Sequence, residues 1–168
     1  GYYSRARNLQ KAARQILERH GGIFPRDAAD IRALAGIGDY TAGAIGSICF
    51  EYPTAAVDGN VLRVVSRMTG SDAPIDKPET KKKIAAELSA VYPAGHCGDF
   101  TQSLMELGAT VCTPRGAKCG ACPLADICAA KREGCVDALP VKGEKRARKI
   151  EERTVFFLEC DGTVAICR

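Results

Sequence analysis

Leu34-Ala35-Gly36-Ile37-Gly38-Asp39-Tyr40-Thr41-Ala42-Gly43 joins two predicted helices, over residues 28–34 and 40–50, through a turn that contains two glycines. Gly36 and Gly38 permit positive φ angles and close approach to the backbone. The turn would expose successive amides where the second helix begins, and such amides bind a phosphate without reading a base. A Gly-x-Gly pair before a helix is weak evidence by itself, because an ordinary turn between helices has it too. The Tyr-Thr-Ala-Gly that follows makes the pattern much more specific.

Helical spacing continues on both sides of this hairpin. A first helix is expected to be capped by Ser4 and to end at Gly21-Gly22, with apolar residues at Leu9, Ala12, Ala13, Ile16 and Leu17. Further helices are predicted at about 59–69, 78–91 and 98–111, each bounded by Gly, Pro or Asp. The first 135 residues therefore predict an all-α fold.

Four of the nine cysteines lie close together, with the spacing Cys-x6-Cys-x2-Cys-x5-Cys. In a chain without a secretory signal such a group is better explained by a metal than by disulfides. Four thiolates suit either tetrahedral zinc or a [4Fe-4S] cluster, and the loose, asymmetric spacing favours the cluster. Arg115 and Lys118 lie between the first two ligands and could reach a phosphate. The four predicted ligands are Cys112, Cys119, Cys122 and Cys128.

A second motif, Ala56-Val57-Asp58-Gly59-Asn60-Val61-Leu62-Arg63-Val64, follows one helix after the hairpin. Its plain interpretation is an Asp58 N-cap on an amphipathic helix, with Val61, Val64 and Val65 in the core and Arg63 and Arg67 facing solvent. A chemical interpretation is also open. Asp58 lies 18 residues after Tyr40, so both could face a common groove, where a carboxylate can stabilise an oxocarbenium-like transition state.

Composition limits the class of protein. The 168 residues are 46% hydrophobic and 26% charged with a formal net charge of +4, which excludes a disordered or collagenous chain and permits a polyanionic partner without proving one. No apolar run approaches the ~20 residues of a membrane span, and Gly1-Tyr2-Tyr3 opens no signal peptide. A soluble protein of the cytosol or nucleus, with no membrane partner, is expected.

The C-terminal part changes character after residue 136. Residues 137–153 are rich in Lys and Arg and contain Pro140 and Gly143, so they predict a basic linker. Residues 154–168 hold two β-rich runs around Asp161-Gly162, the signal of a short hairpin. A lone hairpin is marginal in water, so it is expected to open a second, β-containing domain, and both ends of the sequence look cut.

These motifs, in this order, resemble those of the helix-hairpin-helix DNA glycosylases that carry an iron-sulfur cluster. LAGIGDYTAGAI (34–45), AVDGNVLRV (56–64) and the four-cysteine loop carry the resemblance, and GYYSRARNL (1–9) and Tyr40 point to the adenine DNA glycosylase branch. The resemblance spans about residues 1–135. It implies an enzyme that removes adenine mispaired with 8-oxoguanine or guanine from double-stranded DNA, with the base flipped out of the duplex.

The resemblance also assigns roles by matching position. Asp58 would stabilise the sugar cation, Asn60 would support that site and Tyr40 would lie against the reacting nucleotide. DNA contacts would come from the hairpin and the cluster loop, and the cysteines would hold [4Fe-4S]. The implied DNA-binding residues are Gly36, Ile37, Gly38, Tyr40, Thr41, Arg115 and Lys118.

The implied organisation has four parts. Residues 1–111 would be a helical glycosylase domain whose N-terminal part is missing, with the helix-hairpin-helix at about 28–50. Residues 112–136 would form the cluster module and 137–153 the linker. Residues 154–168 would begin the Nudix-like C-terminal domain that reads 8-oxoguanine.

Two departures from the family pattern stand out. Ala35 replaces the usual Pro of the hairpin, which loosens the turn. The family's general acid, a Glu, belongs to a helix upstream of residue 1 and has no counterpart here, so excision by these 168 residues alone is expected to be negligible. The acidic residues before Asp58 are each assigned to a helix surface or turn by their own pattern: Glu18, Asp27, Asp30, Asp39 and Glu51.

The residues alone leave two other functions open. An endonuclease III-like glycosylase/lyase would need a Lys amine in place of Tyr40. A non-catalytic iron-sulfur DNA-binding module, or a zinc-ribbon scaffold, would use the hairpin for backbone affinity alone. The chain is expected to be a monomer, cytoplasmic and nucleoid-associated in a bacterium, or nuclear or mitochondrial in a eukaryote.

Overall fold

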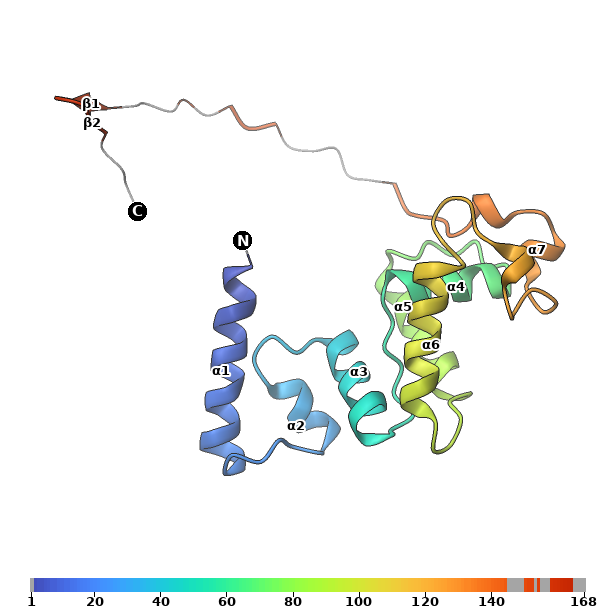
Figure 1. Cartoon of the computed structure of the whole chain (residues 1–168), viewed down its shortest axis with the longest axis horizontal. Helices are drawn as coiled ribbons and strands as arrows, with labels where there is room; N and C mark the ends of the chain where they lie inside the picture. The colour runs from blue at the N-terminus through green and yellow to red at the C-terminus, as the bar shows by residue number, and fades with distance from the viewer. Residues whose placement is uncertain (1, 145–149, 153, 155–157, 165–168) are drawn as a thin grey trace.

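A computed structural model of the chain describes residues 2–144, 150–152, 154 and 158–164. The described part is helical apart from one small β-hairpin (Figure 1), which confirms the predicted all-α class. The main helices are α1 (Tyr3–His20), α2 (Ala28–Ala33), α3 (Asp39–Phe50), α4 (Gly59–Thr69), α5 (Pro78–Ser89) and α6 (Cys97–Thr110). The shorter elements are η1 (Cys119–Ala121), α7 (Ala129–Arg132) and η2 (Val136–Ala138).

Local signals explain where most helices begin and end. The Asp27 carboxylate accepts the Ala29 amide at 2.8 Å at the start of α2, and Gly21 ends α1 with a left-handed φ of 60°. The expectation of a Ser4 cap is wrong. Helix α1 begins at Tyr3 because the Tyr2 carbonyl already accepts the Arg5 and Ala6 amides, so Ser4 lies inside the first turn.

Helix α4 is the centre of the core. Every residue from Val61 to Arg67 is buried. The apolar side chains of α4 pack with those of α5, α6 and the loop before α5: Val61, Leu62, Val64, Val65, Ile75, Ile84, Leu88 and Leu104. The expectation that Arg63 and Arg67 face solvent is therefore wrong, since only 8% and 2% of these residues is exposed. Between Val61 and Arg67 helix α4 has no solvent face, and both guanidinium groups are buried against backbone carbonyls.

Helix α1 lies at one end of the helical part, beside α2 (Figure 1). Its apolar spacing suggests a buried face, yet among the described residues of α1 only Ala12 is buried. Leu9 and Leu17 remain 75% and 67% exposed. Two polar residues of α1 contact the hairpin: Gln15 Oε1 accepts the Ala35 amide at 2.7 Å, and Asn8 lies against Gly36.

The segment that follows α7 is held on the loop before α5. The Ile75 amide donates to the Val141 carbonyl at 3.0 Å, and the Asp76 carboxylate accepts the Gly143 amide at 2.8 Å. This backbone hydrogen bond lowers the pKa of the Asp76 carboxyl. Most of the basic side chains predicted in the linker lie outside the described residues: Lys145, Arg146, Arg148, Lys149 and Arg153.

The predicted hairpin at Asp161-Gly162 is confirmed in its central part. Strand β1 (Glu159–Cys160) pairs antiparallel with β2 (Thr163–Val164). Residues 155–157 and 165–168 of the two predicted runs lie outside the described part. No helix of the described residues is long and apolar enough to cross a membrane.

Candidate nucleic-acid interface and metal centre

The two glycines of the hairpin have different roles. Gly36 has a φ of 80°, and a Cβ at this position would lie 2.7 Å from the Cβ of Asn8 on α1. Only glycine fits there. Gly38 has a φ of −97° in extended backbone, so it does not use the positive φ that glycine permits. Gly38 is the N-cap of α3 and nothing lies within 4 Å of where its Cβ would be, which leaves the amides behind it accessible.

The start of α3 offers a row of amides. Within the described residues the amides of Gly38, Asp39, Tyr40 and Thr41 have no acceptor, because the first intrahelical bond is donated by Ala42. The Ile37 amide donates to the Leu34 carbonyl at 3.2 Å, so it closes the turn and does not face a ligand. Four amides at the positive end of a twelve-residue helix suit a phosphate.

Ala35 gives the hairpin a contact that a proline could not make. Its amide donates to the Gln15 Oε1 of α1 at 2.7 Å. Proline has no amide hydrogen to donate. The looser turn expected from Ala35 is thus tied to α1 by a hydrogen bond, and Gln15 is a residue that the sequence pattern did not single out.

Tyr40 lies on the wall of a groove of 960 Å³ between α2, α3 and α5. The ring is 44% exposed, and its hydroxyl donates to the Met105 Sδ of α6 at 3.9 Å. Val57, the neighbour of Asp58, lines the same groove, whereas Asp58 itself does not. Arg32, Lys81 and Lys82 give the groove a basic rim.

Asp58 is the first member of a hydrogen-bonded chain that runs to the cysteine loop. Its Oδ1 accepts the Val61 amide at 2.8 Å, and its Oδ2 accepts the Asn60 Nδ2 at 3.1 Å. Asn60 Oδ1 in turn accepts an Arg63 NH2 hydrogen at 2.9 Å, and Arg63 Nε donates to the Cys112 carbonyl at 2.7 Å. The carboxylate is therefore both a helix cap and a group of fixed orientation.

The buried side chain of Arg63 joins three parts of the fold: α4, the cysteine loop and α6. It also donates to the Gly108 carbonyl of α6 at 2.6 Å. A Cβ on Gly108 would lie 2.6 Å from the Asn60 Cβ, so α6 closes tightly over Asn60. Burial lowers the pKa of the Arg63 guanidinium from its ordinary value. The group still carries its charge at neutral pH, because arginine begins from a very high pKa.

We expect Arg63→Gln to lower the urea midpoint of unfolding by about 1 M, the equivalent of about 2–3 kcal/mol. The substitution leaves the carbonyls of Gly108 and Cys112 buried without their charged donor. Arg132→Gln is the matched control. Among the described residues Arg132 forms an ion pair with its exposed neighbour Glu133, so this substitution should change the midpoint little. Equal midpoints for the two variants would contradict the role given to Arg63.

The four clustered cysteines line one small cavity. Cys112 follows α6, Cys119 begins η1, Cys122 ends it and Cys128 caps α7. All four are half-buried. Arg115 and Lys118 are exposed, and Lys118 also lines the cavity. Among the described residues no group of three or more potential ligands is close enough together to hold a metal ion. Four thiols that line one cavity are a donor set that could hold either an iron-sulfur cluster or a zinc ion.

Arg67 is the second buried guanidinium of α4, and it ties this cavity to the fold. It donates to the Cys112 Sγ at 3.4 Å and to the Thr113 carbonyl at 2.8 Å. On its other side it donates to the carbonyls of Val136 and Leu139, both at 2.9 Å. A permanent cation against the Cys112 sulfur would offset the negative charge of a thiolate there. The spacing of Arg63 and Arg67 within an otherwise apolar run is the one sequence signal that could have revealed these roles.

Three of the five acidic residues before Asp58 have structural partners in the described part of the chain. Asp27 caps α2, Asp39 pairs with Arg32 at 3.2 Å, and Glu51 accepts two amides of α6. None of them has a hydrogen bond or ion pair with Asp58 in the described part of the chain. This agrees with the assignment of these residues to helix surfaces and turns.

Comparison with known proteins identifies the family. Residues 1–93, which include α1, the hairpin and α4, match the HhH-GPD superfamily of base excision DNA repair proteins. The chain belongs to the HhH-GPD superfamily. The hairpin and the Asp58 segment thus lie inside the matched region, while the cysteine loop follows it.

Curated relatives of this HhH-GPD protein are adenine DNA glycosylases. The protein of Mus musculus is 43% identical over 164 residues, which cover 95% of this chain and 31% of the relative. That of Homo sapiens is 43% identical over 79% of this chain and 24% of the relative. That of Buchnera aphidicola subsp. Schizaphis graminum is 35% identical over 94% and 45%. The chain thus spans less than half the length of these three relatives.

Solved structures confirm the fold of the superfamily. A thermostable thymine-DNA glycosylase superposes with a TM-score of 0.69 at 32% identity, covering 77% of this chain and 59% of that one. A non-covalent endonuclease III-DNA complex superposes with a TM-score of 0.65 at 26% identity, covering 79% and 60%. The expected helix-hairpin-helix fold is therefore confirmed.

Proposed function

We propose that this chain carries the DNA-binding hairpin, the sugar-facing carboxylate and the cluster module of an adenine DNA glycosylase. The reaction is hydrolysis of the N-glycosidic bond of adenine opposite 8-oxoguanine or guanine. The observation that carries the proposal is Asp58, whose two oxygens are held by Val61 and Asn60 beside the groove that Tyr40 lines. Similarity to adenine DNA glycosylases from bacteria and eukaryotes supports the choice of base.

Asp58 has one chemical task in this reaction. As the bond to adenine lengthens, positive charge builds on the sugar, and a fixed carboxylate stabilises that charge without reorganising. Asn60 and Arg63 hold the carboxylate in place, and Tyr40 lies against the reacting nucleotide. An aspartate that also caps its own helix cannot turn away from the sugar without losing the cap.

Adenine also needs a proton before it can leave, and among the described residues we assign no acid to this task. We assign the general acid to a helix upstream of residue 1. The groove between α2, α3 and α5 has room for such a segment, and its wall carries Tyr40. Excision by these 168 residues alone is therefore expected to be negligible.

The cysteine loop would hold [4Fe-4S] through Cys112, Cys119, Cys122 and Cys128. When bound, a cluster would hold the loop as one rigid unit. Arg67 would offset the charge of the thiolates, and Arg115 and Lys118 are exposed for phosphate contacts. Gly38, Tyr40 and Thr41 would contribute amides to a second phosphate, so binding to duplex DNA should weaken as salt rises.

The remaining assignments belong to the same proposal. Residues 1–111 are the glycosylase domain, 112–136 the cluster module and 137–153 the linker. Residues 154–168 begin the domain that reads 8-oxoguanine. The protein acts as a monomer where the genome is, in the bacterial cytoplasm or in the nucleus or mitochondria of a eukaryote.

The enzyme should be monofunctional, and this test also distinguishes it from an endonuclease III-like lyase. Tyr40 is a phenol and cannot form the imine that strand cleavage through a Schiff base requires. With the chain extended upstream by its natural sequence or that of the mouse relative, an A:8-oxoguanine duplex should yield free adenine and an intact abasic strand. That strand should break only after added alkali or heat.

Borohydride is the control for this prediction. It should trap no covalent adduct between the extended chain and the duplex, whereas an endonuclease III control run in parallel should be trapped. Adduct formation at the level of that control would contradict the proposed reaction. Duplex binding without release of adenine would favour the non-catalytic DNA-binding module.

A further inference from the structure

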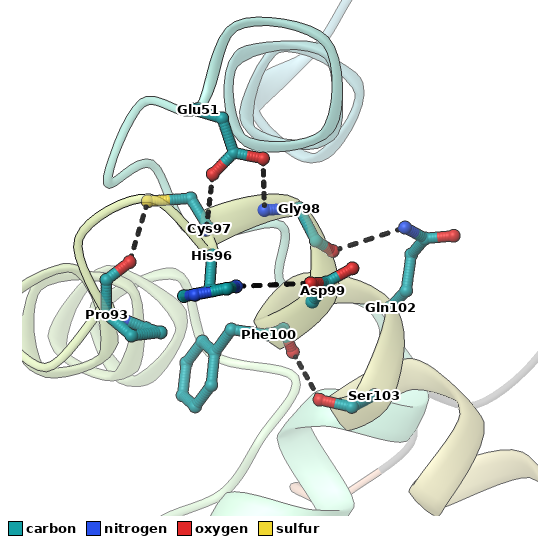
Figure 2. A network of polar contacts seen from close by, with 9 residues as sticks. All are labelled: Glu51, Pro93, His96, Cys97, Gly98, Asp99, Phe100, Gln102 and Ser103. Atoms are coloured by element: carbon teal, nitrogen blue, oxygen red, sulfur yellow. Dashed lines mark hydrogen bonds and ion pairs between the residues drawn. The ribbon is translucent and has the colours of Figure 1, made fainter.

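Glu51 joins two helices that are far apart in the sequence. It follows α3 with a left-handed φ of 56°, a conformation that non-glycine residues seldom adopt. Figure 2 shows its carboxylate directed at the start of α6. One oxygen accepts the Cys97 amide at 2.6 Å and the other accepts the Gly98 amide at 3.3 Å. Two charge-assisted hydrogen bonds hold Glu51 in a conformation that its backbone alone disfavours.

The helices touch closely beside these bonds. A Cβ on Gly98 would lie 3.2 Å from the Ile48 Cα, so α6 begins directly against the backbone of α3. One turn further along, the Thr101 hydroxyl donates to the Ser47 hydroxyl at 2.8 Å in the buried contact between the two helices. The end of α3 and the start of α6 therefore have one fixed register.

The same two helices meet again at the proposed reaction site. Met105 lies seven residues beyond Gly98, about 10 Å along α6. Its Sδ accepts a hydrogen bond from the hydroxyl of Tyr40, which lies at the start of α3. Three residues further, Gly108 closes over Asn60, the partner of Asp58. Helix α6 thus connects the Tyr40 side of the site with the Asp58 side.

We propose that Glu51 is a positioning residue for glycosidic bond cleavage: by fixing the start of α6 against the end of α3, it sets the contact of Tyr40 with Met105. This inference rests on the proposed role of Tyr40 in the reaction. It requires that loss of the two Glu51 hydrogen bonds changes the surroundings of Met105, a residue to which Glu51 has no hydrogen bond in the described part of the chain.

The sequence offers a direct probe of this effect, because the chain has only two methionines. In the 168-residue protein labelled with ¹³C at the Met methyl groups, Met105 reports on the Tyr40 ring and Met68 of α4 serves as an internal reference. Tyr40→Leu gives the position of the Met105 methyl resonance when the contact is lost. No DNA and no excision activity is needed, so the result does not depend on the proposed reaction being right.

We expect Glu51→Gly to move the Met105 resonance toward its Tyr40→Leu position while Met68 stays in place. Glycine accepts the left-handed φ without strain, which favours a folded variant. Glu51→Gln keeps one of the two acceptors and should give an intermediate shift. Protection of the Cys97 and Gly98 amides from hydrogen exchange should fall by about tenfold in Glu51→Gly.

Glu106→Gln on α6 is the charge-matched control and should leave both methionine resonances unchanged. A Met105 resonance that stays at the wild-type position in Glu51→Gly, while amide protection falls, would overturn the proposal and leave Glu51 a local cap. Unchanged amide protection would overturn it as well. If Glu51→Gly does not fold, the same decision rests on Glu51→Gln, where an unmoved Met105 resonance counts against the proposal.

Discussion

Asp58→Asn, in the chain extended upstream, is expected to lower the rate of adenine excision from an A:8-oxoguanine duplex by at least about 100-fold. The amide has the shape of the carboxylate and can still cap α4, but it has no charge to set against the cation that forms on the sugar. Affinity for the duplex should change little, because the hairpin amides and the cluster loop are untouched. Single-turnover excision and a binding titration measure the two effects separately.

Asp27→Asn is the matched control for this substitution. Asp27 caps α2 as Asp58 caps α4, and its carboxylate likewise accepts backbone amides. The same chemical change there should leave the excision rate within a fewfold of the wild type. A comparable loss of rate in both variants would mean that Asp58 acts through the stability of its helix and not through its charge.

Cys119→Ser is expected to remove the cluster and to unfold the loop that it organises. The wild-type protein should be brown and hold about four irons per chain, as four-cysteine cubane sites do. The loop from 112 to 135 has little apolar core of its own, so without the cluster it should lose its structure. Iron analysis measures the loss of iron, visible absorption measures the loss of colour, and hydrogen exchange measures the loss of structure in residues 112–135.

Cys135→Ser is the control, because Cys135 is the last residue of the loop and does not line the cavity of the other four. That variant should keep its iron and its colour. A colourless wild-type protein with one zinc would contradict the cluster and favour the zinc alternative that the cysteine spacing left open.

The elements that could be predicted are those with local signals. Helix α2 begins at an Asp cap and α1 ends at Gly21, features of a few neighbouring residues that no distant contact overrides. The helix-hairpin-helix was predictable for the same reason, although Gly38 serves as an N-cap in extended backbone. The four cysteines were predictable as a group because they lie close together in the sequence.

The features that could not be predicted depend on contacts between distant segments. Arg63 and Arg67 occupy what a helical wheel assigns to the polar face, and their burial depends on carbonyls that lie 45 or more residues away. Glu51 looks like an ordinary acidic residue after a helix, and only α6 gives its carboxylate a partner. No motif marks the contact of Glu51, and the spacing of Arg63 and Arg67 is equally typical of a solvent-facing stripe, so neither pattern alone identifies the partner.

The most direct test of the proposed function compares the 168-residue chain with the same chain extended upstream. Each is incubated with an A:8-oxoguanine duplex, and released adenine is measured. We predict that the extended chain releases adenine and that the 168-residue chain binds the duplex without releasing it. Full-rate release by the 168-residue chain would show that the general acid lies among its own residues, and no release by either would contradict the proposed reaction.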